Sequence, residues 1–326
     1  MDDAAEPVDP GPPMASALDE TPGPPWFTAA LAAERRVGTV DVDGCAINYL
    51  EWGDRSKPHV LLVHGFLAHA RCFEFVAPLL APNLHVVAMD LSGMGDSGHR
   101  PTYRREDRVA EVVAVAGATG MLDGPAPAFL VTHSYGSTIG IDTFEADPTT
   151  FAGFVLCDLM MLPPDVLSAW MGGGNEEARL SRGVARPHRT HPDLTTALSR
   201  YRLSPPQPCA NGWAVRHIGR HSLREVEGGW QWKFDPQVLV DDEHGPDWWI
   251  GLPPRFAALA TRKAEIHGAD SMLMTPAAVD YVRGLTGPSV PFIPIPAAHH
   301  HLFLDQPIAY AAALSAVITT WAATPG

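Results

Sequence analysis

The sequence predicts an α/β fold, in which a mostly parallel central sheet is flanked by helices and carries an inserted helical lid. Short β-rich runs alternate with helical segments from about residue 36 to residue 157, the pattern of a sheet covered on both faces. The alternation stops between residues 160 and 255 and resumes from residue 264. A length of 326 residues suits one large domain with a substantial insertion. We therefore expect a disordered tail at 1–25, an α/β core at 26–159 and 256–326, and a lid at 160–255.

Local patterns predict the individual elements in chain order. Alternating residues on either side of Asp43-Gly44 predict an opening hairpin. Solidly apolar runs predict central strands buried on both faces, and these runs lie at 60–63, 85–89, 129–131 and 154–157. Apolar residues at helical spacing before Gly117 predict a helix between the second and third of these strands. After the lid, we expect strands at 264–266 and 290–295 and helices at 275–285 and 306–321.

Charge, cysteine content and the N-terminal pattern limit the partners and compartments that the chain suits. The net charge of −14 disfavours a nucleic-acid partner, because that binding needs clustered Lys and Arg. The four cysteines form no CxxC motif, so we expect free thiols and a cytoplasmic protein. The acidic, proline-rich start does not resemble a signal peptide, and the apolar run 308–323 is too short to span a bilayer. We expect no membrane partner, and the sequence is compatible with a homo-oligomer.

The strongest chemical signal is the sequence THSYG at residues 132–136, which lies between an apolar strand and a helix. This pattern is typical of a nucleophile elbow, in which a serine, here Ser134, occupies a strained strand-to-helix turn. The helix N-terminus behind the serine favours developing negative charge. The usual G-x-S-x-G motif has glycine where this chain has Thr132. An S-x-G sequence also occurs by chance, so its position after a buried strand carries the interpretation.

Two further segments lie at the ends of predicted strands. His64-Gly65-Phe66 follows the strand at 60–63, where a glycine lets the backbone approach a ligand and the next N–H can face an oxyanion. The segment 298–307, with the sequence AHHHLFLDQP, follows a strand and precedes the last helix. Together with the elbow, these segments resemble the α/β-hydrolase superfamily over about residues 37–321, apart from the lid.

The resemblance implies a role for each matching residue. Ser134 matches the nucleophile, and the backbone N–H groups of Phe66 and Tyr135 match the oxyanion hole. His300 matches the general base, because the family places that histidine seven residues before the proline that opens the last helix. The family normally has glycine directly before the base, and His299 stands there instead. His299 and His301 therefore stay open as alternative bases.

The triad acid has two candidates. The family usually places it after the strand predicted at 264–266, at a position that is Ser271 in this chain, with Asp270 one residue early. A minority of the family supplies the acid one strand earlier, where Asp158 follows the run 154–157. We expect Asp158 to be the acid and keep Asp270 as the alternative. Either aspartate could instead cap a loop by accepting backbone N–H bonds.

Two other patterns are interpreted as structural. The sequence GMGDSG at residues 93–98 satisfies the G-x-G-x-x-G pattern, but no helix begins within it, so we expect a tight loop beside the active site rather than a dinucleotide site. The three consecutive histidines at 299–301 suggest a metal site, but consecutive loop residues point in different directions and no HExxH spacing is present. We therefore expect neither a metal nor a cofactor.

The sequence thus predicts a serine hydrolase that cleaves a carboxylic ester or lactone through a Ser-His-Asp triad and an acyl-enzyme. Six of the nine tryptophans fall in the lid, which favours a bulky apolar substrate, although these residues could instead build the lid's own core. A thioesterase or a C–C bond hydrolase would use the same triad. A non-catalytic receptor or scaffold on a hydrolase fold is the alternative from another class.

Overall fold

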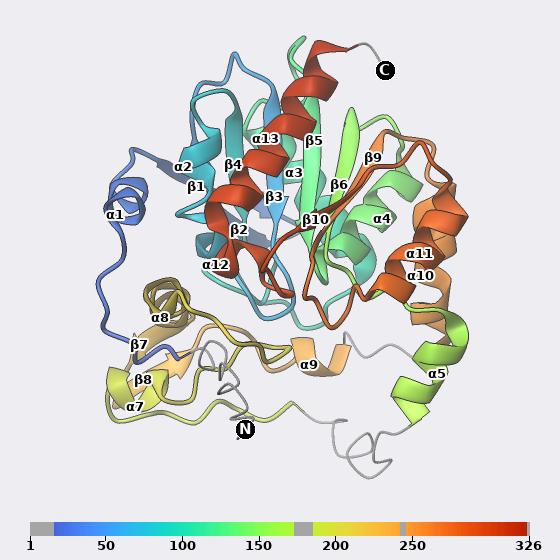
Figure 1. Ribbon diagram of the computed structural model, residues 1–326. Coiled ribbons are helices and arrows are strands. Elements are labelled where there is room, and N and C mark those ends of the chain that lie inside the picture. The colour runs from blue at the N-terminus through green and yellow to red at the C-terminus, as the bar shows by residue number, and fades with distance from the viewer. Residues whose placement is uncertain (1–15, 173–184, 242–245, 325–326) are drawn as a thin grey trace, which may run out of the picture.

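An eight-stranded sheet lies at the centre of the computed structural model, which describes residues 16–172, 185–241 and 246–324 (Figure 1). The strand order is β1-β2-β4-β3-β5-β6-β9-β10. The β1–β2 and β2–β4 pairs are antiparallel, and the remaining neighbours are parallel. The eight strands are β1 (Arg36–Val42), β2 (Cys45–Trp52), β3 (His59–Val63), β4 (His85–Met89), β5 (Ala128–His133), β6 (Gly153–Cys157), β9 (Lys263–Gly268) and β10 (Phe292–Ile295). The expected hairpin and central strands are therefore present.

Helices cover both faces of the sheet. Alternate residues of each central strand point to opposite faces, and both sets are buried and mostly apolar, so each face packs against helices. Leu62 of β3 packs in one apolar cluster with α2 (Ala77–Leu80), α12 (Leu302–Asp305) and α13 (Pro307–Ala323). Leu61 packs in a second cluster on the other face, and the helices that contribute to it are α3 (Arg105–Ala118), α4 (Gly136–Ala146), α10 (Pro246–Ala258) and α11 (Pro276–Thr286). The protein thus has an α/β fold with a mostly parallel sheet, as predicted.

The segment between β6 and β9 holds elements that lie at one end of the sheet, drawn in yellow and light green in Figure 1. They are α5 (Pro164–Gly172), α7 (Leu194–Leu198), α8 (Gly212–His221), the antiparallel hairpin of β7 (Leu223–Val226) and β8 (Gly229–Trp232), and α9 (Val238–Asp241). The insertion therefore contains a hairpin as well as helices. The helix α10 begins inside the range expected for the lid, yet it packs against α4 and α11 of the core.

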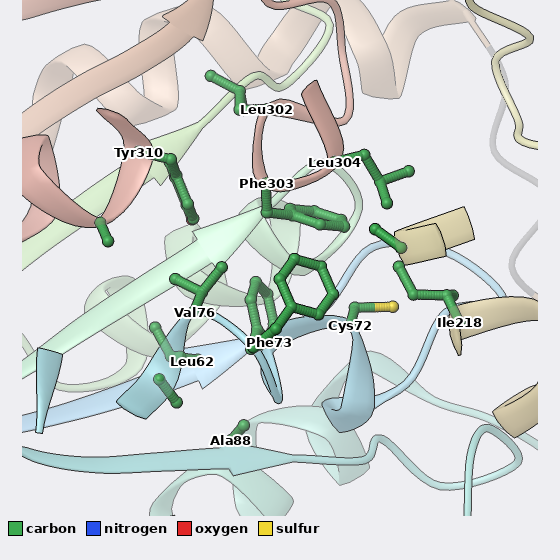
Figure 2. Packing of buried hydrophobic residues seen from close by; sticks show 14 of the residues in the cluster. Leu62, Cys72, Phe73, Val76, Ala88, Ile218, Leu302, Phe303, Leu304 and Tyr310 are labelled. Atoms are coloured by element: carbon green, nitrogen blue, oxygen red, sulfur yellow. The ribbon is translucent and has the colours of Figure 1, made fainter. Parts of the chain in front are cut away.

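The insertion shares one apolar cluster with the core. Ile218 of α8 belongs to the same cluster as Cys72 and Phe73 of the short 3₁₀ helix η1 (Ala70–Phe73), as Figure 2 shows. Phe303 of α12 also packs against Phe73, with ring centroids 5.5 Å apart. The loop that carries His300 and the inserted helix α8 are therefore both packed against η1.

The N-terminal region differs in part from the expected disordered tail. Residues 1–15 lie outside the described residues. Several residues from Ser16 to Pro25 are exposed, but Ala17 is buried against Gly219 of α8, and α1 (Pro25–Leu31) places Phe27 against Trp213. Within the part of the chain that the structure describes, no helix combines the length and apolarity needed to cross a membrane.

Candidate active site

Ser134 occupies a strained turn between β5 and α4. Its φ of 51° lies in the left-handed region, which side chains other than glycine rarely adopt. The N–H of Ser134 donates to the carbonyl of Cys157 at 2.8 Å, which ties the turn to the end of the neighbouring strand. A Cβ at Gly136 would lie 2.6 Å from the carbonyl oxygen of His64, so only glycine fits there. The turn has the features expected of a nucleophile elbow.

Thr132 stands where the usual elbow motif has glycine, and the structure shows how it fits. Its hydroxyl donates to Ser137 Oγ at 2.8 Å, so the buried polar group is satisfied. Space for its methyl group is provided from α4, because a Cβ at Gly140 would lie 3.2 Å from Thr132 Cγ2 and 2.6 Å from the Phe154 ring. The missing side chain at Gly140 of α4 therefore leaves room for the side chain that Thr132 has in place of the motif's glycine.

Asp158 directly follows β6 and lies beside His300, which belongs to the loop after β10. Asp158 Oδ1 is 2.8 Å from His300 Nδ1, and both residues are buried. A carboxylate can only accept, so Nδ1 carries the proton and Nε2 keeps its lone pair. Asp158 also adopts a left-handed φ of 50°, and its N–H donates to the carbonyl of Ile266 at 3.0 Å. The pair has the geometry expected of the acid and the base of a triad.

Two donors, one from the last residue of β9 and one from the loop after it, hold the Asp158 carboxylate in place. The Gly268 N–H donates to Oδ2 at 2.9 Å, and the Ser271 hydroxyl donates to Oδ1 at 2.7 Å. Ser271 thus positions the Asp158 carboxylate. From the sequence alone, position 271 is only the place where the family's usual acid is absent. Asp270 is exposed, and no described residue hydrogen-bonds to its side chain.

The loop after β3 approaches the serine closely. A Cβ at Gly65 would lie 3.2 Å from Ser134 Cβ and 3.1 Å from His133 Nδ1, which explains the glycine. His64 anchors this loop, because its Nε2 accepts the Leu91 N–H at 3.1 Å and its Nδ1 donates to the Gly65 carbonyl at 2.7 Å. Burial lowers the pKa of His64 to about 4, so the ring is neutral at pH 7.

The two residues proposed for the oxyanion hole lie side by side. The rings of Phe66 and Tyr135 meet edge to face with centroids 5.2 Å apart. Tyr135 directly precedes the first residue of α4, so its backbone N–H belongs to a helix N-terminus. The arrangement brings the loop after β3 and the start of α4 to the same side of Ser134.

The other histidines near the site have different surroundings. His299 Nδ1 is 3.1 Å from Asp305 Oδ2, away from Asp158. His301 lines the same cavity as Ser134, but among the described residues its buried Nε2 has no hydrogen-bond partner. His133 Nε2 donates to the carbonyl of His300 at 2.9 Å, and burial lowers the pKa of His133 well below its usual value. Of the three consecutive histidines, only His300 contacts Asp158.

The expectation that the consecutive histidines diverge holds for His299 but not for its neighbours. Ring nitrogens of His133, His300 and His301 lie within 4.8 Å of one another, although His300 Nδ1 is already bonded to Asp158 and His133 Nε2 to a carbonyl. The sequence reasoning considered only the run at 299–301 and missed the contribution of His133 from the neighbouring strand end.

The G-x-G-x-x-G segment forms a series of turns between β4 and α3. The buried Asp90 carboxylate accepts the N–H groups of Ala70 at 2.6 Å and Asp96 at 2.9 Å. Gly95 has a φ of 58°, and a Cβ there would lie 2.2 Å from Asp90 Oδ1. Gly95 also lines the cavity, so this segment is a wall of the site, and the structure places no helix start within it.

A cavity of about 350 Å³ lies over Ser134 and His300. The core contributes Phe66, Leu67 and Phe303, and the insertion contributes Tyr201, Trp232 and Phe234. Of the six lid tryptophans, only Trp232 is among the described residues that line it. Trp213 packs on α1, Trp230 on Arg220, and Trp248 on Arg105 and Trp249, so these tryptophans stabilise the insertion and its contacts.

A strained serine, a hydrogen-bonded aspartate–histidine pair and a covering insertion on this strand order define a hydrolase of the α/β type. Residues 60–313 match the model of the alpha/beta hydrolase family, and the chain belongs to that family.

Individual relatives cover only part of the sequence. A haloalkane dehalogenase of Bradyrhizobium diazoefficiens is 26% identical over 161 residues, which are 48% of this chain and 51% of that protein. The chain thus spans about half the length of this curated relative.

Solved structures resemble nearly the whole chain. The thioesterase domain from the curacin biosynthetic pathway superposes with a TM-score of 0.70, at 21% identity, over 88% of this chain and 99% of that one. E-2-(acetamidomethylene)succinate hydrolase gives a TM-score of 0.69, also at 21% identity, over 88% of this chain and all of that one. At this identity the likeness shows the fold, and the reaction must be inferred from the site.

Proposed function

We propose that this protein hydrolyses a carboxylic ester or lactone through a covalent acyl-enzyme. The observation that carries the proposal is that Ser134, in its strained turn, lines the same cavity as His300, whose Nδ1 is bonded to the buried Asp158. A serine at the elbow favours acyl transfer over the haloalkane and epoxide chemistry of this fold, because that chemistry needs an aspartate nucleophile.

The reaction follows from the roles that the positions allow. His300 Nε2 takes the proton of the Ser134 hydroxyl as the oxygen attacks the substrate carbonyl. The N–H groups of Phe66 and Tyr135 stabilise the oxyanion of the tetrahedral intermediate, and the protonated His300 gives its proton to the leaving alcohol. Water then attacks the acyl-enzyme, with His300 again as base, and the acid product leaves.

The cavity supports an acyl substrate with an apolar portion. Its aromatic and aliphatic lining comes from both the core and the insertion and would contact the apolar portion of the substrate. The substrate lies among Phe66, Tyr201, Trp232 and Phe303 in this proposal.

A hydrolysis panel tests the proposal. Purified wild-type protein and the Ser134→Ala variant are assayed with p-nitrophenyl esters, lactones, acyl thioesters and vinylogous diketones. We expect ester or lactone turnover in the wild type and a loss of several orders of magnitude in the variant. Retention of more than about a tenth of the activity in Ser134→Ala would contradict the nucleophile assignment. Absence of turnover for every member of the panel would favour a receptor or scaffold.

A further inference from the structure

The charged residues that line the cavity are all basic. Arg200, Arg202 and Lys233 contribute to it, and among the described lining residues none is Asp or Glu. The chain as a whole has the opposite balance, with 37 acidic and 23 basic residues. The described lining of the cavity over Ser134 therefore has a positive charge, whereas the chain as a whole has a net negative charge.

Among the residues that the structure describes, a carboxylate partner is present for only one of these three cations. Lys233 Nζ lies 2.5 Å from Asp96 Oδ1. Arg202 Nη1 donates to the carbonyls of Ser199 at 2.8 Å and Tyr201 at 2.7 Å, which are uncharged acceptors. For the Arg200 side chain, the described part of the chain provides neither a hydrogen bond nor an ion pair. Two exposed guanidinium groups at the rim of the cavity thus have no carboxylate partner among the described residues.

Two other arginines of this acidic protein are paired with carboxylates. Arg255 contacts both Asp142 at 2.5 Å and Glu145 at 2.6 Å. Arg71 contacts Glu74 at 3.0 Å. Unbalanced guanidinium groups beside a concave site are the arrangement that binds an anionic group of a ligand, because the planar fork pairs with two oxygens at once.

The segment that carries the two arginines is fixed relative to the proposed base. It continues to Gln207, whose Oε1 accepts the N–H of His301 at 2.9 Å and whose Nε2 donates to Asp305 at 2.9 Å. Asn211 further along donates to the Leu304 carbonyl at 2.7 Å. These bonds join the segment after α7 to the loop of His300, so the backbone that carries Arg200 and Arg202 is tied to the same loop as the proposed base.

We propose that the substrate carries a second, ionised oxyanion, a carboxylate or a phosphate, which Arg200 and Arg202 bind while the scissile carbonyl lies at Ser134. This inference rests on the proposed function and adds a substrate class to it. None of the described residues that line the cavity is a carboxylate that would repel such a substrate, and the rim charges also attract it from solution.

Paired substrates test the inference. p-Nitrophenyl hemisuccinate and p-nitrophenyl butyrate share a leaving group and have similar acyl lengths, and only the first carries a carboxylate. The Arg200→Gln/Arg202→Gln double variant should lose about 10- to 100-fold in kcat/KM for the hemisuccinate relative to the butyrate, mainly through KM. Arg224→Gln is the matched control, because this exposed arginine lies on β7 and does not line the cavity. It should leave the ratio unchanged.

A second arm identifies the source of the anion. Butyryl-coenzyme A carries phosphates on its leaving group, whereas the hemisuccinate carries a carboxylate on its acyl group. A selective loss in the double variant with either compound supports the inference and identifies which anion is bound. Equal losses for the charged and neutral compounds, or no loss, would overturn it.

Binding separates this inference from the proposed function. Monomethyl succinate and its neutral counterpart methyl butyrate are titrated calorimetrically into Ser134→Ala protein with and without the two arginine substitutions. Arginine-dependent binding of the anion, together with a wild-type protein that turns over no member of the ester and lactone panel, would contradict the proposed function and leave the anion site standing. Turnover of the neutral ester with no arginine-dependent anion binding would leave the function standing and remove the anion site.

Discussion

Replacing Asp158 by Asn is the sharpest perturbation of the proposed triad. The carboxylate is buried and accepts from His300 Nδ1 at 2.8 Å, Ser271 Oγ at 2.7 Å and Gly268 N at 2.9 Å. An amide keeps the shape of the carboxylate but has an NH₂ group in place of one oxygen. In one orientation this NH₂ group faces His300 Nδ1, and in the other it faces the Gly268 N–H, so a donor faces a donor in both. With the NH₂ toward His300, the ring must move its proton to Nε2, the atom that should act as base.

The expected magnitude follows from that change of tautomer. Loss of the correct tautomer lowers kcat about 10⁴-fold in the template serine hydrolase mechanism. One unsatisfied buried donor also lowers the free energy of unfolding by about 1–3 kcal/mol. We therefore expect Asp158→Asn to be folded, less stable and about 10³- to 10⁴-fold slower, with a small change in KM.

The assay compares kcat for one activated ester in the two aspartate variants, with urea denaturation as the measure of folding. Asp270→Asn is the matched control, because its exposed carboxylate should change kcat by less than about threefold. A collapse confined to Asp270→Asn would reverse the assignment. An Asp158→Asn protein that keeps more than about a tenth of wild-type kcat would refute the role of Asp158.

Three further predictions follow. Ser271→Asp introduced into Asp158→Asn should recover part of the lost kcat, since position 271 contacts the acid directly, and an absence of recovery would show that an acid there cannot reach the imidazole. Burial alone would raise the pKa of Glu74, but its bond to His217 and the charge of Arg71 hold the pKa near 2, below the usual 4.5. Stability from this carboxylate is therefore full above about pH 4.5 and is lost as the pH falls toward 2, so Glu74→Gln should lower the free energy of unfolding by about 2–3 kcal/mol at pH 7 and less at pH 3. A difference independent of pH in urea titrations would contradict that. Activity should survive EDTA, and loss that added zinc restores would establish a metal requirement.

The core was predictable because its strands are buried on both faces. Parallel strands in such a sheet consist of solid apolar runs, so the residues at 60–63 indicated β3 without any knowledge of its neighbours. The elbow was predictable for the same reason, since Ser134 directly follows such a run. The departure at Thr132 could not be interpreted from sequence, because its compensation by Gly140 is a contact between a strand and a helix face.

The choice between the two aspartates depended on backbone direction. Both follow a strand in the sequence, but only Asp158 has the left-handed φ and the two donors that hold its carboxylate against His300. Ser271 was identified only as the place where the usual acid is missing. Its role as a donor to the Asp158 carboxylate requires the chain after β6 and the loop after β9 to be adjacent, which no local pattern encodes.

The insertion was the least predictable region. Without strand–helix alternation, the positions of its side chains are set by tertiary contacts, and most of its tryptophans pack away from the cavity. The residues that set the charge of the cavity, Arg200 and Arg202, follow a five-residue helix and carry no sequence signal. Their position beside the cavity depends on tertiary hydrogen bonds that join this segment to the His300 loop and to α12.

Covalent labelling of Ser134 tests the proposed mechanism most directly. Wild-type protein is treated with a fluorophosphonate, and the adduct is located by intact-mass and peptide mass spectrometry. We expect one adduct per chain on Ser134, parallel loss of ester hydrolysis, and no adduct in Ser134→Ala. An unlabelled Ser134 in a preparation that still hydrolyses esters would contradict the mechanism.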